Sequence, residues 1–195
     1  IAARVKHNLK IKNNNCVAFD IIFGCPGWVQ GLIQADAFIK AGLAKKCLII
    51  GSETLSRVVD PYDRDSMIYS DGAGACILEA NDTKNKGIIS YADQSFTLEE
   101  AYFLFYGSSY NPKETQTTNY IKMHGRKIYE FALNNVPLAM KTAVDKSKVH
   151  IKQIKKILIH QANEKMDEAI IERFYKLYDI KMPEGIMPMS IHKLG

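Results

Sequence analysis

The chain has 195 residues, of which 47% are hydrophobic and 24% are charged, and its formal net charge is +5. This composition is typical of a folded globular protein with enough apolar material for a sizeable core. No apolar run approaches the roughly 20 residues of a membrane-spanning helix, so we predict a cytoplasmic protein with no membrane partner. The sequence begins at Ile1, inside what resembles an amphipathic helix, which predicts a piece of a longer chain.

The first half of the chain predicts a strand, a helix and a second strand. After a helix end at 1–9, the apolar run 17–23 is predicted to be a buried parallel strand. Helical spacing from Trp28 to Gly42 follows, with Pro26 suited to its first turn, and then comes the apolar run 46–50. Together these segments predict a βαβ unit with a right-handed crossover.

The connector between the two halves is predicted to be irregular over 57–70 and 95–119. Short strands are expected at 71–78, where a glycine turn precedes the strand, and at 87–91. The 95–119 segment has no clean period, and we expect a surface excursion there that could contact a substrate or partner.

The second half predicts a helix from Ile128 to Val144 that is interrupted at Pro137, where we expect a kink or a fresh helix start. A strand at 154–159 should end at His160, and Asn163 can cap the helix that follows. An irregular stretch should then lead into a final short strand. The βαβ patterns on both sides of the connector indicate two related halves in an α/β fold.

Cys25 lies at the junction between the first predicted strand and its helix. Backbone N–H groups and the positive end of the helix dipole would lie beside the sulfur and favour the thiolate. A thiolate is a nucleophile for acyl transfer, whereas a buried, inert cysteine is the commoner fate of this residue type. With Cys16, Cys47 and Cys76, it shows neither zinc-like nor Cys-x-x-Cys spacing, so we predict reduced thiols and no metal.

His160 follows a predicted strand, where a side chain can face the crevice at the carboxyl ends of parallel strands. A neutral imidazole there could donate a hydrogen bond to a developing oxyanion or accept a thiol proton. A satisfied structural histidine is the alternative. If the two halves pack face to face, we expect His160 to meet Cys25.

Positive charge is concentrated between Lys141 and Lys156, where six lysines stand against Asp145. A solvated helix end and loop is the simpler interpretation, and attraction of an acidic partner or phosphate is the alternative. No nucleic-acid partner is predicted, because this basic run has no interleaved aromatic residues for base stacking.

Motifs spread over nearly the whole chain resemble those of thiolase-fold condensing enzymes, most closely the β-ketoacyl-(acyl carrier protein) synthase III family. The motifs are Gly24-Cys-Pro-Gly27, Gly51-Ser-Glu-Thr-Leu-Ser-Arg57, Asp60-Pro-Tyr-Asp-Arg64, Ser70-Asp-Gly-Ala-Gly-Ala75, Met123-His-Gly-Arg-Lys-Ile-Tyr129, His160-Gln-Ala-Asn163 and Ile191-His-Lys-Leu-Gly195. The resemblance implies a thiolase-like α/β fold of two related halves packed in layers, incomplete at both ends. Residues 1–115 would carry the nucleophile, and residues 116–195 would begin the half that carries the histidine.

The resemblance also implies decarboxylating condensation of an acyl-CoA primer with malonyl-(acyl carrier protein) in fatty acid biosynthesis. Cys25 would carry the acyl group as a thioester. His160 would hold the malonyl carbonyl together with an asparagine expected directly after Gly195. Acyl-CoA and the phosphopantetheine-linked malonyl group are then substrates, and no permanently bound cofactor is implied. Pro26 departs from the small residue that is common after the family's cysteine.

Binding roles follow from the same resemblance. Arg64, Gly125 and Asn163 would contact CoA or pantetheine, and Met67 and Tyr69 would line the acyl end. The acidic carrier protein would dock on Arg126, Lys127 and Lys165. The family fold implies a homodimer.

Three other functions remain open. A related thiolase-fold acyltransferase of specialised lipid or polyketide synthesis could use the same cysteine and histidine. A non-catalytic partner subunit of a condensing heterodimer is the alternative from another class, although such partners usually lack the nucleophile. A scaffold that only binds a carrier protein rests on the basic segment alone and is the weakest candidate.

Overall fold

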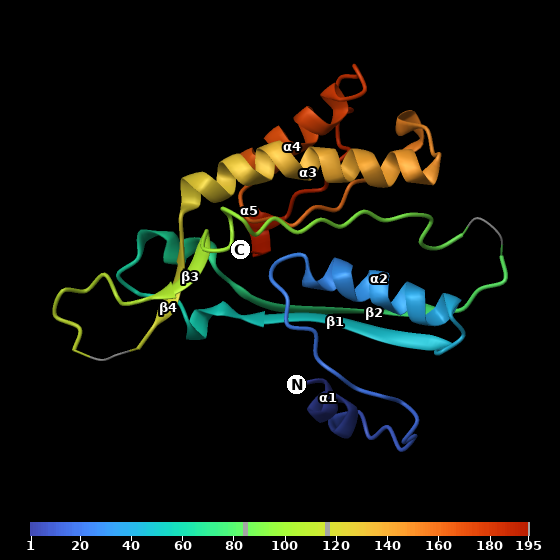
Figure 1. Ribbon diagram of the computed structural model, residues 1–195, viewed down its shortest axis with the longest axis horizontal. Helices are drawn as coiled ribbons and strands as arrows, with labels where there is room; N and C mark the ends of the chain where they lie inside the picture. The colour runs from blue at the N-terminus through green and yellow to red at the C-terminus, as the bar shows by residue number, and fades with distance from the viewer. Residues whose placement is uncertain (84–85, 116–117, 195) are drawn as a thin grey trace. The chain divides into compact units, whose positions relative to one another are not determined.

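The computed structural model describes residues 1–83, 86–115 and 118–194 (Figure 1). Its helices are α1 (Ala2–Asn8), α2 (Gly27–Lys40), α3 (Gly125–Ser147), α4 (Glu164–Lys176) and α5 (Ile191–Leu194), with 3-10 helices η1 (Leu55–Arg57), η2 (Arg64–Ile68) and η3 (Ile151–Gln153). Its strands are β1 (Lys46–Thr54), β2 (Asp71–Glu79), β3 (Leu104–Gly107) and β4 (Tyr120–Met123). The chain divides into two compact units, one formed by 1–51 and 75–80 and the other by 52–74 and 81–195. The predicted division at residue 115 stays a prediction.

The first unit packs α2 against β1. The approach is close because the contact points are glycines: a Cβ on Gly31 would lie 2.9 Å from Cγ2 of Ile49, and one on Gly51 would lie 3.3 Å from Trp28. Ile33 and Ala35 complete the buried side of the helix. The predicted helix after Cys25 is therefore confirmed, as is the strand at 46–50, which continues to Thr54.

β1 and β2 form a two-stranded sheet. The N–H of Ala80 donates to the carbonyl of Lys45 at 2.9 Å, and the N–H of Ser56 donates to Oδ1 of Asp71 at 2.9 Å. The start of β1 thus lies beside the end of β2, and the strands run in opposite directions. β2 includes the glycines at its start, where we had expected a turn.

The strand predicted at 17–23 is wrong, because this segment is assigned to no strand. A strand needs a neighbour for its N–H and C=O groups, and the segment pairs with no strand among the described residues. Its apolar side chains are largely exposed, with Val17 at 78% and Ile22 at 99%. The βαβ pairing of 17–23 with β1 is therefore absent from the described part of the chain.

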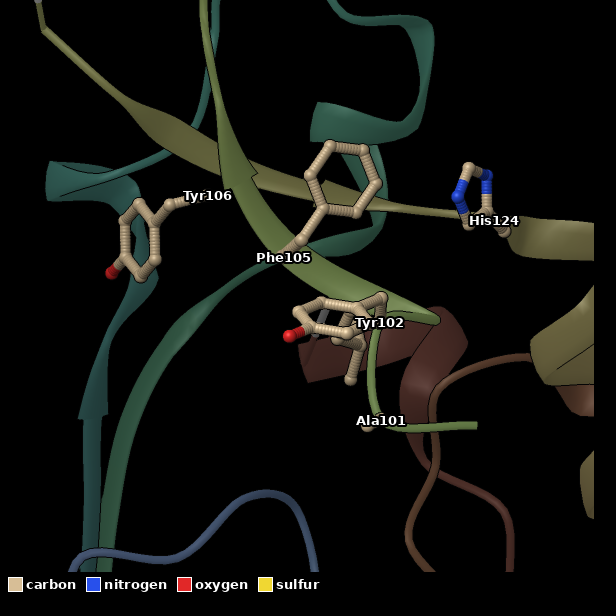
Figure 2. Close-up of a pocket in the computed structure, with 6 residues that line it drawn as sticks. Ala101, Tyr102, Phe105, Tyr106 and His124 are labelled. Atoms are coloured by element: carbon tan, nitrogen blue, oxygen red, sulfur yellow. The ribbon is translucent and has the colours of Figure 1, made fainter. Parts of the chain in front are cut away.

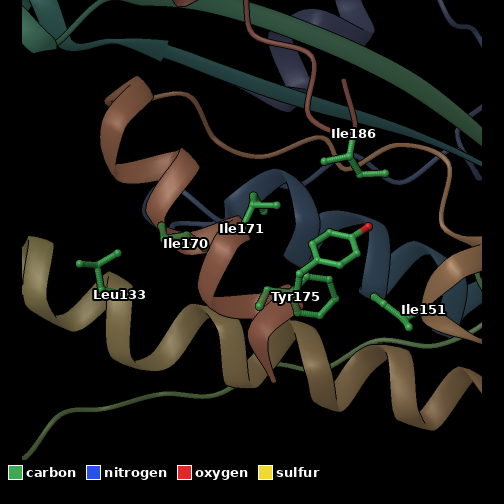
Figure 3. Close-up of a cluster of buried hydrophobic side chains, with 7 residues drawn as sticks. Leu133, Ile151, Ile170, Ile171, Tyr175 and Ile186 are labelled. Atoms are coloured by element: carbon green, nitrogen blue, oxygen red, sulfur yellow. The ribbon is translucent and has the colours of Figure 1, made fainter. Parts of the chain in front are cut away.

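The second unit has its core between α3 and α4 (Figure 3). The buried side chains come from these two helices, from η3 and from the segment before α5: Leu133, Ile151, Ile170, Ile171, Phe174, Tyr175 and Ile186. The rings of Phe174 and Tyr175 meet edge to face at 5.3 Å. Asn163 caps α4 as predicted, since its Oδ1 accepts a hydrogen bond from the N–H of Met166 at 3.1 Å.

Pro137 does not restart α3, which runs without interruption from Gly125 to Ser147. A proline inside a helix leaves the carbonyl four residues earlier without its usual donor, and here that carbonyl belongs to Leu133. Arg173 of α4 supplies the donor, with Nη1 3.0 Å from the Leu133 oxygen and 3.1 Å from Oδ1 of Asn134. The neighbouring helix thus compensates for the proline, which the helical spacing alone could not indicate.

β3 and β4 form an antiparallel hairpin in register Leu104↔Met123 to Gly107↔Tyr120. β3 was not predicted, because 95–119 shows no strand period. The strands predicted at 87–91 and 154–159 are wrong, since neither segment is assigned to a strand. Residues 154–160 have no assigned secondary structure, and among the described residues their backbone bond to a distant part of the chain runs from Ile157 N to Ile186 O at 2.9 Å. The final strand is wrong as well: Ile191–Leu194 is α5, and Gly195 lies outside the described residues.

Candidate active site

Cys25 lies in the turn immediately before α2, and its side chain is exposed. The turn is closed by a hydrogen bond from Gly27 N to Gly24 O at 2.8 Å. Pro26 is the N-cap of α2 and not its first helical residue. All four cysteines lie within the described residues and none is in a disulfide, while burial raises the pKa of Cys47. The position of Cys25 at a helix start therefore agrees with the prediction, although no strand precedes it.

His160 lies at the end of the irregular 154–160 segment, and its side chain is exposed. Three residues later the Asn163 cap starts α4. His160 belongs to the second unit and Cys25 to the first, and their meeting stays a prediction.

Asp167, in the first turn of α4, is 1% exposed. Among the described residues neither carboxylate oxygen has a hydrogen-bond partner. Burial raises the pKa of Asp167 to about 6, and the nearby charge of His160 opposes that rise. The burial of Asp167 was not predictable from the sequence, since an acidic residue in a first helical turn is normally exposed and favourable there.

The loop with the predicted CoA and acyl contacts is organised around η2. Asp63 caps this short helix by accepting a hydrogen bond from the N–H of Asp65 at 2.9 Å. Arg64 is exposed, Met67 is 82% exposed and Tyr69 is half-buried.

A buried ion pair anchors that loop to β4. Lys122 is 1% exposed and Asp60 is 0% exposed, and the Lys122 ammonium binds both Asp60 and, at 3.2 Å, Oδ2 of Asp63. Asp60 also accepts hydrogen bonds from the Tyr110 N–H at 2.7 Å and the Ser109 hydroxyl at 2.9 Å. Buried charges persist when they are paired and fully hydrogen-bonded in this way.

These contacts also set the protonation of the pair. Burial alone would raise the pKa of Asp60, but the hydrogen bonds from Lys122, Tyr110, Tyr62 and Ser109 outweigh it and hold that pKa well below its usual value. Burial likewise acts to lower the pKa of Lys122, and the bonds to Asp60 and Asp63 more than offset it, so the net shift is upward. Both groups therefore stay charged across the physiological range.

Gly125, the first residue of α3, lies beside the same loop: a Cβ there would be 3.6 Å from Oδ2 of Asp65. The parallel bridge Val59↔Ile121 adds a second tie between the loop and β4. The structure therefore places Gly125 next to the loop that carries Arg64, and the CoA contacts of both residues stay a prediction.

The three predicted docking residues are all exposed, but they differ in their surroundings. Arg126 is engaged by Glu130, with Nε 2.8 Å from Oε1. The Lys127 ammonium lies over the ring of Phe103 at 5.3 Å from its centroid. Lys165 projects from the first turn of α4.

A pocket of about 540 Å³ lies on the β3–β4 hairpin next to the start of α3 (Figure 2). It is lined by Ala101, Tyr102, Leu104, Phe105, Tyr106 and His124. The rings of Phe105 and His124 lie 5.1 Å apart. None of the ten predicted site residues lines this pocket.

Asp60, Asp63 and Lys122 were missed by sequence reasoning. The signal available for them was a lysine in the otherwise apolar Tyr120–Met123 strand, opposite a loop with two aspartates. The hydrogen bonds of Gln161 were also not predicted, although this residue stands inside the His160 motif.

The family model for 3-oxoacyl-[acyl-carrier-protein] synthase III matches residues 19–95. A β-ketoacyl-[acyl-carrier-protein] synthase III of Streptococcus pneumoniae is 36% identical over 191 residues, which is 95% of this chain and 57% of that protein. One from Erythrobacter litoralis is 36% identical over 162 residues, covering 80% of this chain and 49% of the relative. The chain thus spans about half the length of the curated relatives it matches.

Solved structures agree. A synthase III of Pseudomonas aeruginosa superimposes with a TM-score of 0.84 at 25% identity, over 100% of this chain and 57% of that one. The Thermus thermophilus enzyme gives a TM-score of 0.78 at 30% identity, over 95% and 56%. The fold is therefore the thiolase-like α/β fold of condensing enzymes, as predicted. Within that class, the chain is similar to the β-ketoacyl-(acyl carrier protein) synthase III family, by the family model over 19–95 and by the curated relatives over most of its length.

Among the residues that the structure describes, no helix combines the length and the apolar character needed to cross a lipid bilayer. Nor do these residues include a group of three or more His, Cys, Asp or Glu side chains placed to hold a metal ion.

Proposed function

We propose that the protein is a cytoplasmic β-ketoacyl-(acyl carrier protein) synthase III, which condenses an acyl-CoA primer with a malonyl-carrier in fatty acid biosynthesis. The observation that carries this proposal is the exposed Cys25 in the turn before α2. It occurs in a chain that aligns with a synthase III over 95% of its length. The first helical turn favours a thiolate at that position.

In the first half-reaction, the Cys25 thiolate attacks the carbonyl carbon of the acyl-CoA. A new thioester forms on Cys25, the C–S bond to CoA breaks, and CoA leaves as a thiolate. In the second, the malonyl thioester loses CO₂, and the electron pair of the broken C–C bond gives an enolate. His160 donates a hydrogen bond to the enolate oxygen. The enolate carbon then attacks the acyl group, and the Cys25 thiolate leaves.

Substrate contacts are proposed for the loop anchored by Lys122. Arg64 and Gly125 meet the CoA moiety, and Asn163 meets the pantetheine amides. Met67 and Tyr69 line the acyl end. The exposure of Arg64 and the closeness of Gly125 to η2 support this assignment.

The acidic carrier protein is proposed to dock on the face with Arg126, Lys127 and Lys165, and the protein to act as a homodimer. The exposure of all three basic side chains supports docking, and the family resemblance supports the dimer.

The test is acylation of the full-length protein by a mass-tagged acyl-CoA, followed by intact mass and peptide mapping. Wild type should gain one acyl group on Cys25, and Cys25→Ser should gain none. Cys16→Ser serves as the matched control and should acylate like wild type. An unmodified wild type, or an adduct that survives in Cys25→Ser, contradicts the proposal. Primers from acetyl to long and branched chains then separate this function from a related specialised acyltransferase.

A further inference from the structure

Residues 156–161, before α4, and residues 185–190, after it, run next to each other. Nζ of Lys156 donates to the Gly185 carbonyl at 2.6 Å, and the N–H of Ile157 donates to the Ile186 carbonyl at 2.9 Å. In the third pair the direction is reversed, since Oε1 of Gln161 accepts from the N–H of Ser190, and all three pairs are separated by 29 residues. The constant separation means that 156–161 and 185–190 run in the same direction in a fixed register.

Gln161 makes the last connection between these segments, and it uses both sides of its amide. Its Oε1 accepts from the N–H of Ser190 at 2.7 Å, from the Ser190 hydroxyl at 3.2 Å and from the N–H of Ile191 at 3.0 Å. Its Nε2 donates to the carbonyl of Pro188 at 3.2 Å. Each side of the amide faces partners of the opposite kind, which fixes its orientation.

This clamp bears directly on His160, because the two residues share a peptide bond. The backbone before His160 is held by Ile157, and the backbone after it is held by Gln161 and by the Asn163 cap of α4. The imidazole is exposed, so its position depends on its own backbone. A group that must meet a developing charge works best when its position is set beforehand.

We propose that Gln161 is a positioning residue for His160, and that it acts by tying the His160 backbone to Pro188–Ile191. The proposal rests on the function given above, in which His160 serves the second half-reaction only. Loss of the clamp should therefore slow decarboxylation and condensation, and it should leave acylation of Cys25 intact.

The experiment measures the two half-reactions separately in the full-length protein. Acyl transfer to Cys25 is followed by intact mass, and decarboxylation by release of labelled CO₂ from a carboxyl-labelled malonyl-carrier. Gln161→Leu keeps most of the side-chain volume but none of the hydrogen bonds, and we expect a fall of about 100-fold in CO₂ release. Acylation should stay within about twofold. Gln161→Glu keeps the acceptor oxygens and loses only the Pro188 contact, so it should recover at least about tenfold over Gln161→Leu.

Gln153→Leu is the matched control, since Gln153 Oε1 also accepts from a backbone N–H, that of His150 at 3.0 Å. Gln153→Leu should leave the ratio of the CO₂-release rate to the acylation rate unchanged. If Gln161→Leu fails to fold, Ser190→Ala removes one donor alone and should give a smaller loss confined to CO₂ release. Equal loss of both half-reactions, or normal CO₂ release, overturns the positioning role. A wild type that never acylates at Cys25 overturns the proposed function instead.

Discussion

Lys122 and Asp60 show how strongly a buried charge depends on its partner. Each is almost completely inaccessible, and together they hold the η2 loop on β4. Removing one member of a buried ion pair leaves the other charged and unsatisfied, which costs about 3–5 kcal/mol.

Lys122→Met should therefore lower the free energy of unfolding by about 3–5 kcal/mol, because it leaves the buried Asp60 carboxylate without its cation. Urea unfolding monitored by circular dichroism measures the loss. The double variant Asp60→Asn with Lys122→Met removes both charges and should be more stable than Lys122→Met alone. A double variant that is less stable by the sum of two separate losses would contradict this account.

Asp167 presents the opposite case, a buried carboxylate without a hydrogen-bond partner among the residues described. Its pKa of about 6 in the folded protein exceeds the ordinary 3.8. The folded state therefore binds the proton more tightly than the unfolded state, and Asp167 lowers stability progressively as pH rises from about 4 through 6.

Asp167→Leu should raise the free energy of unfolding at pH 8 by about 1–3 kcal/mol, because it removes an unsatisfied buried charge. The gain should shrink towards pH 4, where the wild-type carboxyl is protonated. Urea titrations at the two pH values provide the measurement, with Glu168→Leu, an exposed neighbour on α4, as the control. An equal gain at both pH values would show that the charge of Asp167 is not responsible.

At the scale of elements, the α4 cap separates a structural role from a proposed binding role. Asn163→Ala should cost about 1 kcal/mol, because the N–H of Met166 loses its acceptor. Asn163→Asp keeps that acceptor and should keep the stability. If Asn163 also donates to the pantetheine arm, Asn163→Asp should raise the KM for acyl-CoA, since a carboxylate cannot donate. An unchanged KM would leave Asn163 with its capping role alone.

The longer helices α2, α3 and α4 were predictable because apolar stripes and caps such as Asn163 are local features, whereas the short α5 was predicted as a strand. The strands were less so. β1 was recognised from its apolar run, but 17–23 has the same kind of run and forms no strand among the described residues. Strand formation depends on a partner elsewhere in the chain, and no local pattern supplies that information. β3 was missed for the same reason.

At the scale of the whole molecule, ordered motifs predicted the fold, which the solved structures confirm, and the similarity to the synthase III family, which the curated relatives also show. The candidate site was predicted as residue identities, and the structure adds the contacts that hold them. Lys122 stands out as a lysine in an otherwise apolar segment, but its partner Asp60, 62 residues earlier, could not be identified from the sequence. Long-range polar pairs of this kind become visible only when the chain is folded.

Carrier docking is a property of the whole molecular surface. Lys165→Glu should raise the KM for malonyl-carrier about five- to tenfold at low salt, with a smaller effect as salt is added, because exposed charges steer an acidic partner. Lys176→Glu, at the other end of α4, is the matched control and should change the KM little. Steady-state kinetics at two salt concentrations measure both, and an unaltered KM in Lys165→Glu would remove this residue from the docking face.

The hydrogen bond from Arg173 to the Leu133 carbonyl favours one alignment of α3 and α4 along their length. Sliding α4 by one turn, about 5.4 Å, would carry the guanidinium away from the one oxygen in α3 that Pro137 deprives of a donor. Apolar side chains alone discriminate less against such a shift, because one apolar contact can replace another. Here the backbone hydrogen bond that α3 lacks at Pro137 is replaced by one from a single residue of α4, so Pro137 and Arg173 together fix the register of the two helices.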